Sequence, residues 1–195
     1  FMAIIETLKE AGILVFIDEI QTFGRLYKLF GFQYYGLESY VDIVSIGKMS
    51  QVCATLFNEK VKPRPGLLSQ TFTTSTVAIR ASSSIIKRLI NGDFYGEHGR
   101  IAAIHNQFID GFDKISKRHP NLVEGPYGLG GMLAFTAYKG DNKKVQEYLQ
   151  RLFEKGVIAF TAGSNPTRVR LLAPLLSITD EDIKQVLFIL EDALL

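Results

Sequence analysis

Two residues with complementary chemistry follow two apolar runs of the sequence. Asp18 comes directly after ILVFI (13–17), and Lys48 ends the segment VDIVSIGK (41–48). In open parallel sheets, ligand sites gather at the carboxyl ends of strands. A carboxylate there can hold a cationic nitrogen, and a lysine in an apolar surround becomes a better nucleophile because it is charged less readily. Together the two residues suit pyridoxal phosphate, whose aldehyde condenses with a lysine and whose pyridine nitrogen pairs with an aspartate.

Spacing alone leaves a plainer interpretation open. An acidic residue after a buried strand is often a loop carboxylate or a helix cap, and the dipeptide GK is common. Glu19, beside Asp18, is expected to brace the loop rather than to do chemistry. The hypothesis that Asp18 and Lys48 bind pyridoxal phosphate therefore needs support from the rest of the sequence.

Hydrophobic periodicity predicts the elements that position these residues. The first part of the chain fits part of a parallel α/β sheet, and the rest fits a smaller α+β domain. We therefore expect an α/β fold with two domains, 1–93 and 94–195. The predicted helices are 2–11, 77–90, 101–115, 145–153 and one capped by Thr179; the predicted strands are 13–17, 42–48, 52–58, 130–138, 157–162 and 167–173.

Composition restricts the partners. Hydrophobic residues make up 47% and charged residues 22% of the 195 residues, and the net charge is +2. Such a weak field favours neither nucleic acid nor an anionic membrane, so neither is expected as a partner. The single cysteine, Cys53, fits a reducing, cytoplasmic location and is interpreted as a packed core thiol. His98, His105 and His119 share no metal-binding spacing, so no metal is expected.

Two longer segments carry a family resemblance. LVFIDEIQTFGR (14–25) and FGFQYYGLESYVDIVSIGK (30–48) resemble the class III, or ω-amino acid, aminotransferases. That family's pattern is a strand, then D-E-[VI]-Q-T-G-F-G-R, then P-D-I-V-x-x-[AGS]-K. The resemblance covers essentially the whole chain. It implies the pyridoxal-phosphate-dependent transferase fold of type I, with this chain as the C-terminal half: part of the large domain followed by the small domain.

The resemblance also implies roles for individual residues. Asp18 matches the aspartate that pairs with the pyridine nitrogen, and Gln21 the glutamine near the cofactor's ring hydroxyl. Lys48 matches the lysine that forms the Schiff base and then shuttles a proton as base and acid. Thr71 falls where the family binds the cofactor phosphate, usually across a dimer interface. A homodimer is therefore expected, and a missing N-terminal half is a possible further partner.

Arg170 matches the family arginine that binds the substrate carboxylate, for which a planar guanidinium is suited. Arg168 is a rival, because alternation along a strand puts both side chains on the same face. The segment GKMSQVCATLF (47–57) is similar to the lysine ε-aminotransferase branch, with the 4-aminobutyrate transaminases as near relatives. The implied reaction moves an amino group from a basic or ω-amino acid to a 2-oxo acid such as 2-oxoglutarate.

Departures from the family pattern keep two alternatives open. TFTTS (71–75) replaces the family's T-[FW]-G-G-N, and Tyr127 stands where the motif R-G-x-G-L-M has its arginine. Side chains at the former glycines would crowd the phosphate loop. One alternative is a truncated, non-catalytic fragment or pseudoenzyme that acts as a binding or interaction module. The other is a different fold-type-I enzyme, such as a mutase or decarboxylase, built on the same residues.

Overall fold

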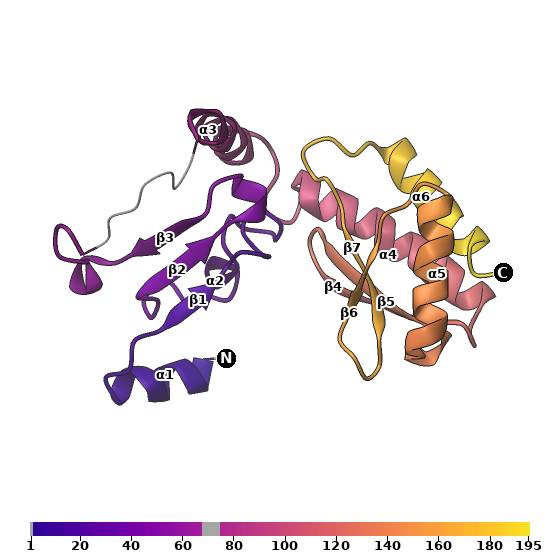
Figure 1. Cartoon of the computed structure of the whole chain (residues 1–195), viewed down its shortest axis with the longest axis horizontal. Helices are drawn as coiled ribbons and strands as arrows, with labels where there is room; N and C mark the ends of the chain where they lie inside the picture. The colour runs from indigo at the N-terminus through magenta and orange to yellow at the C-terminus, as the bar shows by residue number, and fades with distance from the viewer. Residues whose placement is uncertain (1, 68–74) are drawn as a thin grey trace. The chain divides into compact units, whose positions relative to one another are not determined.

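The computed structural model describes residues 2–67 and 75–195 and divides into two compact units (Figure 1). Unit 1 is Phe1–Gly96 and unit 2 is Glu97–Leu195. Helices and strands occur in both units, which is the α/β character that the sequence predicts. That the two units correspond to the large and small domains with a boundary after residue 93 stays a prediction.

Unit 1 is built on a three-stranded sheet with the order β1-β2-β3. Strands β1 and β2 are parallel, so their carboxyl ends share one edge of the sheet, whereas β3 runs antiparallel to β2. The sheet, which was expected to be mostly parallel, is therefore mixed. The elements are α1 (Met2–Glu10), β1 (Phe16–Asp18), α2 (Gly31–Tyr34), β2 (Ile43–Ile46), the 3-10 turn η1 (Lys48–Ser50), β3 (Ala54–Phe57), the 3-10 turn η2 (Glu59–Val61) and α3 (Thr76–Asn91).

Strand β1 is shorter and more exposed than its apolar sequence predicts. It begins at Phe16, whose side chain is 59% exposed, and Ile13 and Leu14 before it are exposed as well. Within the described residues β1 pairs only with β2 and forms an edge of the sheet. The apolar run was expected to be buried on both faces, but among the described residues it has only one neighbouring strand, and the face that is covered is the one where Val15 packs with Ile5 of α1 and Leu37.

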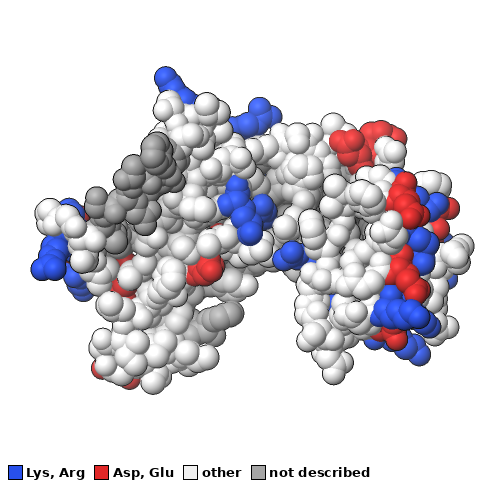
Figure 2. Space-filling view, in the orientation of Figure 1, with Lys and Arg blue, Asp and Glu red and all other residues white. Residues whose placement is uncertain are grey.

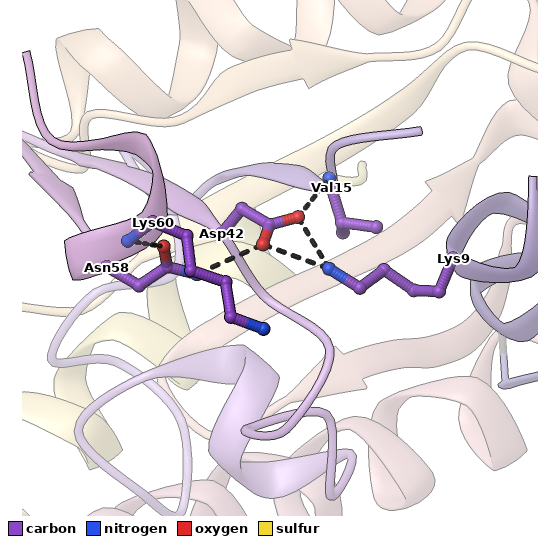
Figure 3. A network of polar contacts seen from close by, with 5 residues as sticks. All are labelled: Lys9, Val15, Asp42, Asn58 and Lys60. Atoms are coloured by element: carbon purple, nitrogen blue, oxygen red, sulfur yellow. Dashed lines mark hydrogen bonds and ion pairs between the residues drawn. The ribbon is translucent and has the colours of Figure 1, made fainter. Parts of the chain in front are cut away.

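The Asp42 carboxylate joins three segments of unit 1 (Figure 3). Its side chain is only 4% exposed, and its oxygens lie 2.7 and 2.9 Å from Lys9 Nζ at the end of α1. It also accepts hydrogen bonds from the Val15 amide before β1 (2.8 Å) and from Asn58 Nδ2 after β3 (3.0 Å). These contacts, led by the one from Lys9, hold the pKa of Asp42 below its usual value.

The turn after β2 has an unusual backbone. Lys48 and Gln51 have positive φ angles of 51° and 59°, the left-handed region that side chains other than glycine seldom adopt. The Gln51 side chain and amide both donate to the Lys48 carbonyl at 3.0 Å. Buried Ser50 fixes the end of the turn by donating to the Val52 carbonyl at 2.6 Å. Lys48 is thus presented from a tightly constrained turn.

Unit 2 is a four-stranded antiparallel sheet with the order β4-β5-β7-β6. The sequence did not predict β4, since Gly125, Pro126 and Gly128 suggest a turn. A register shift between Glu124 and Tyr127 accommodates these residues in the strand. The elements are α4 (Arg100–Arg118), β4 (Val123–Leu129), β5 (Met132–Ala137), the 3-10 turn η3 (Tyr138–Gly140), α5 (Asn142–Glu154), β6 (Phe160–Ala162), β7 (Arg168–Leu172) and α6 (Asp180–Asp192).

The helices of unit 2 pack on one face of this sheet. Phe135 of β5 contacts both Phe112 of α4 and Tyr148 of α5 through its ring. The Tyr148 hydroxyl donates to the Leu190 carbonyl of α6 at 2.6 Å, and burial raises the pKa of Tyr148. Acidic and basic side chains alternate over α5 and α6 on the face that Figure 2 shows. Among the helices of the described residues, none has the length and apolar character that crossing a membrane requires.

Acid should lower the free energy of unfolding of unit 1, because protonation weakens the contacts of the Asp42 carboxylate. Because the folded-state pKa lies below the unfolded value of about 3.9, this contribution is present in full above that value and is lost as pH falls through the folded-state pKa. We expect Asp42→Asn to cost about 1–3 kcal/mol at pH 7 and its difference from the wild type to shrink below about pH 4. Urea unfolding followed by hydrogen–deuterium exchange of residues 13–19 measures this.

The matched control is Glu59→Gln in the same unit, because the ion pair of Glu59 with Lys62 is exposed. It should change stability little at any pH. A pH-independent difference between the wild type and Asp42→Asn would contradict the assigned role of Asp42.

The positive φ angle of Lys48, in the turn after β2, leads to a second prediction. Lys48→Gly should be more stable than Lys48→Ala by about 1 kcal/mol, since glycine adopts a positive φ without steric cost. Both variants lack the lysine side chain, so urea unfolding compares the backbone alone. The same pair of substitutions at Lys28, which is exposed and not among the residues with positive φ, should give the opposite order. If Lys48→Ala were at least as stable as Lys48→Gly, as expected for the same pair at Lys28, the Lys48 turn would not be strained.

Candidate active site

Asp18 lies at the carboxyl end of β1 and is paired in register with Ser45 of β2. Its Oδ1 accepts hydrogen bonds from Ser45 Oγ (2.9 Å) and from the Ile20 amide (2.9 Å). Its Oδ2 has no hydrogen-bond partner among the residues that the structure describes. The carboxylate is exposed, so one oxygen is held in place while the other faces outward and remains available to a ligand.

Lys48 follows β2, the strand parallel to β1, and therefore stands at the same edge of the sheet as Asp18. Neighbouring strands are about 4.8 Å apart, and Ser45 to Lys48 spans at most about 11 Å of extended chain. The Lys48 side chain is exposed, and its amine makes no hydrogen bond or ion pair with any described residue. The described residues do not provide the apolar surround that the sequence suggested for this lysine.

The loop after Asp18 is held from two sides. Buried Glu19 accepts hydrogen bonds from the Phe32 amide (2.8 Å) and from the Thr22 hydroxyl, which confirms it as a structural brace. Gly24 has a φ of 74°, and a Cβ there would lie 3.1 Å from the Met49 side chain. Because Met49 belongs to the turn that presents Lys48, this loop and that turn form one packed structure.

Gln21 lies in the same loop, and its Oε1 is buried without a hydrogen-bond partner among the described residues. A buried amide oxygen without a partner is costly and indicates that a donor is absent. Arg25 Nη1 donates to the Gln21 backbone carbonyl at 2.9 Å and fixes this part of the loop. Gln21 Oε1 is therefore a second oxygen at this edge without a partner among the described residues; the first is Asp18 Oδ2.

The other predicted site residues lie apart from this edge in the sequence. Thr71 falls outside the described residues. Arg170 is a half-buried residue of β7 in unit 2, its guanidinium carbon lies 5.8 Å from the centre of the Phe160 ring, and its Nε is buried without a partner in the described chain. Cys53, which precedes β3, is exposed rather than packed in the core.

Two residues with clear roles were missed at the sequence level. Ser45 orients Asp18, and Asp42 ties β1 to its neighbours. The Asp42 signal was visible as the D of the D-I-V motif, but an acidic residue before an apolar run has many interpretations. The Ser45 contact depends on the register between two strands that are 27 residues apart in sequence, so no local pattern reveals it.

The groups at this edge fit pyridoxal phosphate on the structure's own evidence. A carboxylate with one free oxygen suits a protonated ring nitrogen, a buried amide oxygen suits a ring hydroxyl, and an unpaired amine suits an aldehyde carbon. Among the described residues, no group of three or more His, Cys, Asp and Glu side chains that could hold a metal ion occurs.

Relatives among known proteins agree with this chemistry. Acetylornithine aminotransferase of Prochlorococcus marinus is 26% identical over 90% of this chain and 42% of its own length. A [LysW]-aminoadipate semialdehyde/glutamate semialdehyde transaminase, assigned as putative in Pyrobaculum aerophilum, is 30% identical over 94% of this chain and 46% of its own. The chain thus spans less than half the length of these relatives.

Solved structures show the same fold. Ornithine δ-aminotransferase of Plasmodium falciparum matches all of the chain and 50% of its own, with 25% identity and a TM-score of 0.79. Lysine aminotransferase of M. tuberculosis matches all of the chain and 44% of its own, with 24% identity and a TM-score of 0.81. The family model for class-III aminotransferases matches residues 1–194. The chain therefore belongs to the class-III aminotransferase family.

Proposed function

We propose that the protein carrying this chain transfers an amino group from a basic or ω-amino acid, lysine-like or 4-aminobutyrate-like, to a 2-oxo acid such as 2-oxoglutarate, with pyridoxal phosphate as cofactor. The observation that carries the proposal is the edge where Asp18 and Lys48 follow adjacent parallel strands. The names of the relatives support the donor class, since acetylornithine, lysine and ornithine all carry an amino group at the end of a chain.

Bound pyridoxal phosphate would supply an aldehyde and an electron-accepting ring. Asp18 would hold the ring nitrogen through the oxygen that Ser45 leaves free, and its fixed negative charge would keep that nitrogen protonated. The amide of Gln21 would pair with the ring hydroxyl. Lys48 Nζ would bind the aldehyde carbon at rest and then take a proton from the substrate carbon and return it.

The remaining roles are assigned by the family resemblance. Arg170 would bind the substrate carboxylate, Thr71 would bind the cofactor phosphate, and a second subunit would complete the phosphate site. Because the chain spans less than half of its relatives' length, we assign the rest of the substrate pocket to residues outside it. A homodimer and a cytoplasmic location belong to the same proposal.

Reductive trapping tests the proposal. After incubation with pyridoxal phosphate and reduction with borohydride, peptide mapping should find the pyridoxyl group on Lys48. The exposed lysines Lys28 and Lys60 serve as internal controls for nonspecific reaction. In the protein carrying this chain, Lys48→Ala should lose both the label and amino transfer, the latter by about 10²–10⁴-fold or more, because proton transfer at the substrate carbon is lost.

Asp18→Asn separates the role of Asp18 at the ring nitrogen from the role of Lys48 at the aldehyde. It should keep the label on Lys48 but slow amino transfer, because the ring nitrogen loses its charged partner. Even labelling of all exposed lysines would overturn the proposal and favour a non-catalytic binding module. Labelling of Lys48 without any requirement for a 2-oxo acid would instead favour a mutase or decarboxylase.

A further inference from the structure

The turn that carries Lys48 holds two residues in a conformation that glycine adopts more easily. Lys48 and Gln51 have φ angles of 51° and 59°. A side chain at such an angle crowds the backbone, so each residue costs free energy that a glycine would avoid. Strain of this kind persists only where the surroundings impose it, and it is concentrated at functional sites. Lys48 is the expected catalytic group, whereas the proposed chemistry gives no role to Gln51.

Gln51 donates two hydrogen bonds to the Lys48 carbonyl. Its backbone amide and its side-chain Nε2 each lie 3.0 Å from this oxygen. A glycine at position 51 would keep the first bond, would lose the second and would adopt the positive φ without strain. The glutamine side chain therefore adds a contact that closure of the turn does not require, and this contact is made to the residue that presents the amine.

The peptide groups on both sides of Lys48 are held by hydrogen bonds. On its N-terminal side, Gly47 is buried and its carbonyl accepts from the Ser50 amide at 3.3 Å. On its C-terminal side, the two donors of Gln51 hold the Lys48 carbonyl. Rotation of either peptide group about the Lys48 Cα would change the direction of its Cα–Cβ bond relative to β2. These bonds therefore set the direction in which the lysine side chain leaves the turn.

The side chain of Lys48 has no comparable restraint. It is exposed, and its amine makes no hydrogen bond or ion pair with any described residue. A lysine amine stands at the end of a flexible four-carbon chain, so its average position follows the direction of the Cα–Cβ bond. The amine must meet an aldehyde at the edge of the sheet that Asp18 also occupies, and a small misplacement there slows a reaction considerably. The backbone of Lys48 is therefore the part of this residue through which its amine can be aimed.

We propose that Gln51 is a positioning residue for Lys48. Its Nε2 bond fixes the Lys48 carbonyl and thereby directs the amine toward the edge of the sheet where Asp18 lies. Gln51 contacts neither cofactor nor substrate in this role, because it acts through the backbone of Lys48. The inference rests on the proposed function of Lys48, and it goes beyond that function by naming a residue that makes this lysine differ from other exposed lysines of the chain.

Reductive trapping at a limiting concentration of pyridoxal phosphate measures how well the amine is placed. The lysine amine condenses with the aldehyde and releases water, and borohydride then adds hydride to the C=N carbon, so the pyridoxyl group stays on the nitrogen. The readout is the label on Lys48 divided by the mean label on the exposed Lys28 and Lys60. Gln51→Met keeps the side-chain length and the positive φ but removes the donor. It should lower this ratio about threefold to tenfold, the factor that one hydrogen bond of typical strength supplies.

Gln51→Gly separates positioning from stability. Because glycine relieves the positive φ, its urea midpoint should lie about 0.3–1 M above that of Gln51→Met, as followed by hydrogen–deuterium exchange of residues 43–57. The Lys48 labelling ratio should nevertheless fall as far in both variants, because both lack Nε2. A side chain that only stabilised the turn would make the ratio follow the midpoint. The matched control is Gln150→Met on α5, which removes an exposed bond to Glu154 and should leave ratio and midpoint unchanged.

The wild type and the variants distinguish a failure of this inference from a failure of the proposed function. If the wild type labels Lys48 preferentially and Gln51→Met keeps that preference, the inference alone is overturned. It is also overturned if the Gln51→Gly ratio recovers together with its stability, or if Gln150→Met lowers the ratio as much as Gln51→Met. Even labelling of Lys48, Lys28 and Lys60 in the wild type would overturn the proposed function and the inference with it.

Discussion

The parallel pairing of β1 with β2 is the constraint on which the candidate site depends, and the buried Asp42 carboxylate maintains it. Strand β1 is short and has only one neighbour among the described residues, so its ladder alone gives little stability. Asp42 adds a side-chain bond to the amide of Val15 at its start and an ion pair to α1 beyond it. A slip of one residue would reverse the faces of β1 and remove Asp18 from Ser45.

Most elements could be predicted from local patterns because each pattern reports a local preference. Apolar spacing predicted α3, α4 and α5, and the capping box of Thr179 and Asp182 marked the start of α6. The failures are not local. The antiparallel direction of β3, the exposure of β1 and the existence of β4 depend on which strands meet, and partners distant in sequence decide that.

In the candidate site, too, local patterns predicted some features, whereas others depend on partners that are distant in sequence. Asp18 and Lys48 could be found because residues after apolar strands gather at one edge when the strands are parallel. The unpaired oxygen of Gln21 could not, since it depends on the packing of the loop against the turn through Gly24 and Met49. Likewise, alternation predicted that Arg168 and Arg170 share a face, but no pattern predicted the ring of Tyr127 beneath Arg168.

The two units hold their charged groups in physically different ways. In unit 1, hydrogen bonds to Ser45 and the Ile20 amide fix Asp18, and a constrained turn presents Lys48. Moving either group would disturb the backbone, so their chemistry tolerates little change. In unit 2, Arg168 and Arg170 rest on aromatic faces, which orient a cation but allow it to come from more than one strand. Changes in substrate preference are therefore expected to concentrate in the arginines and rings of unit 2, while the groups of unit 1 stay the same.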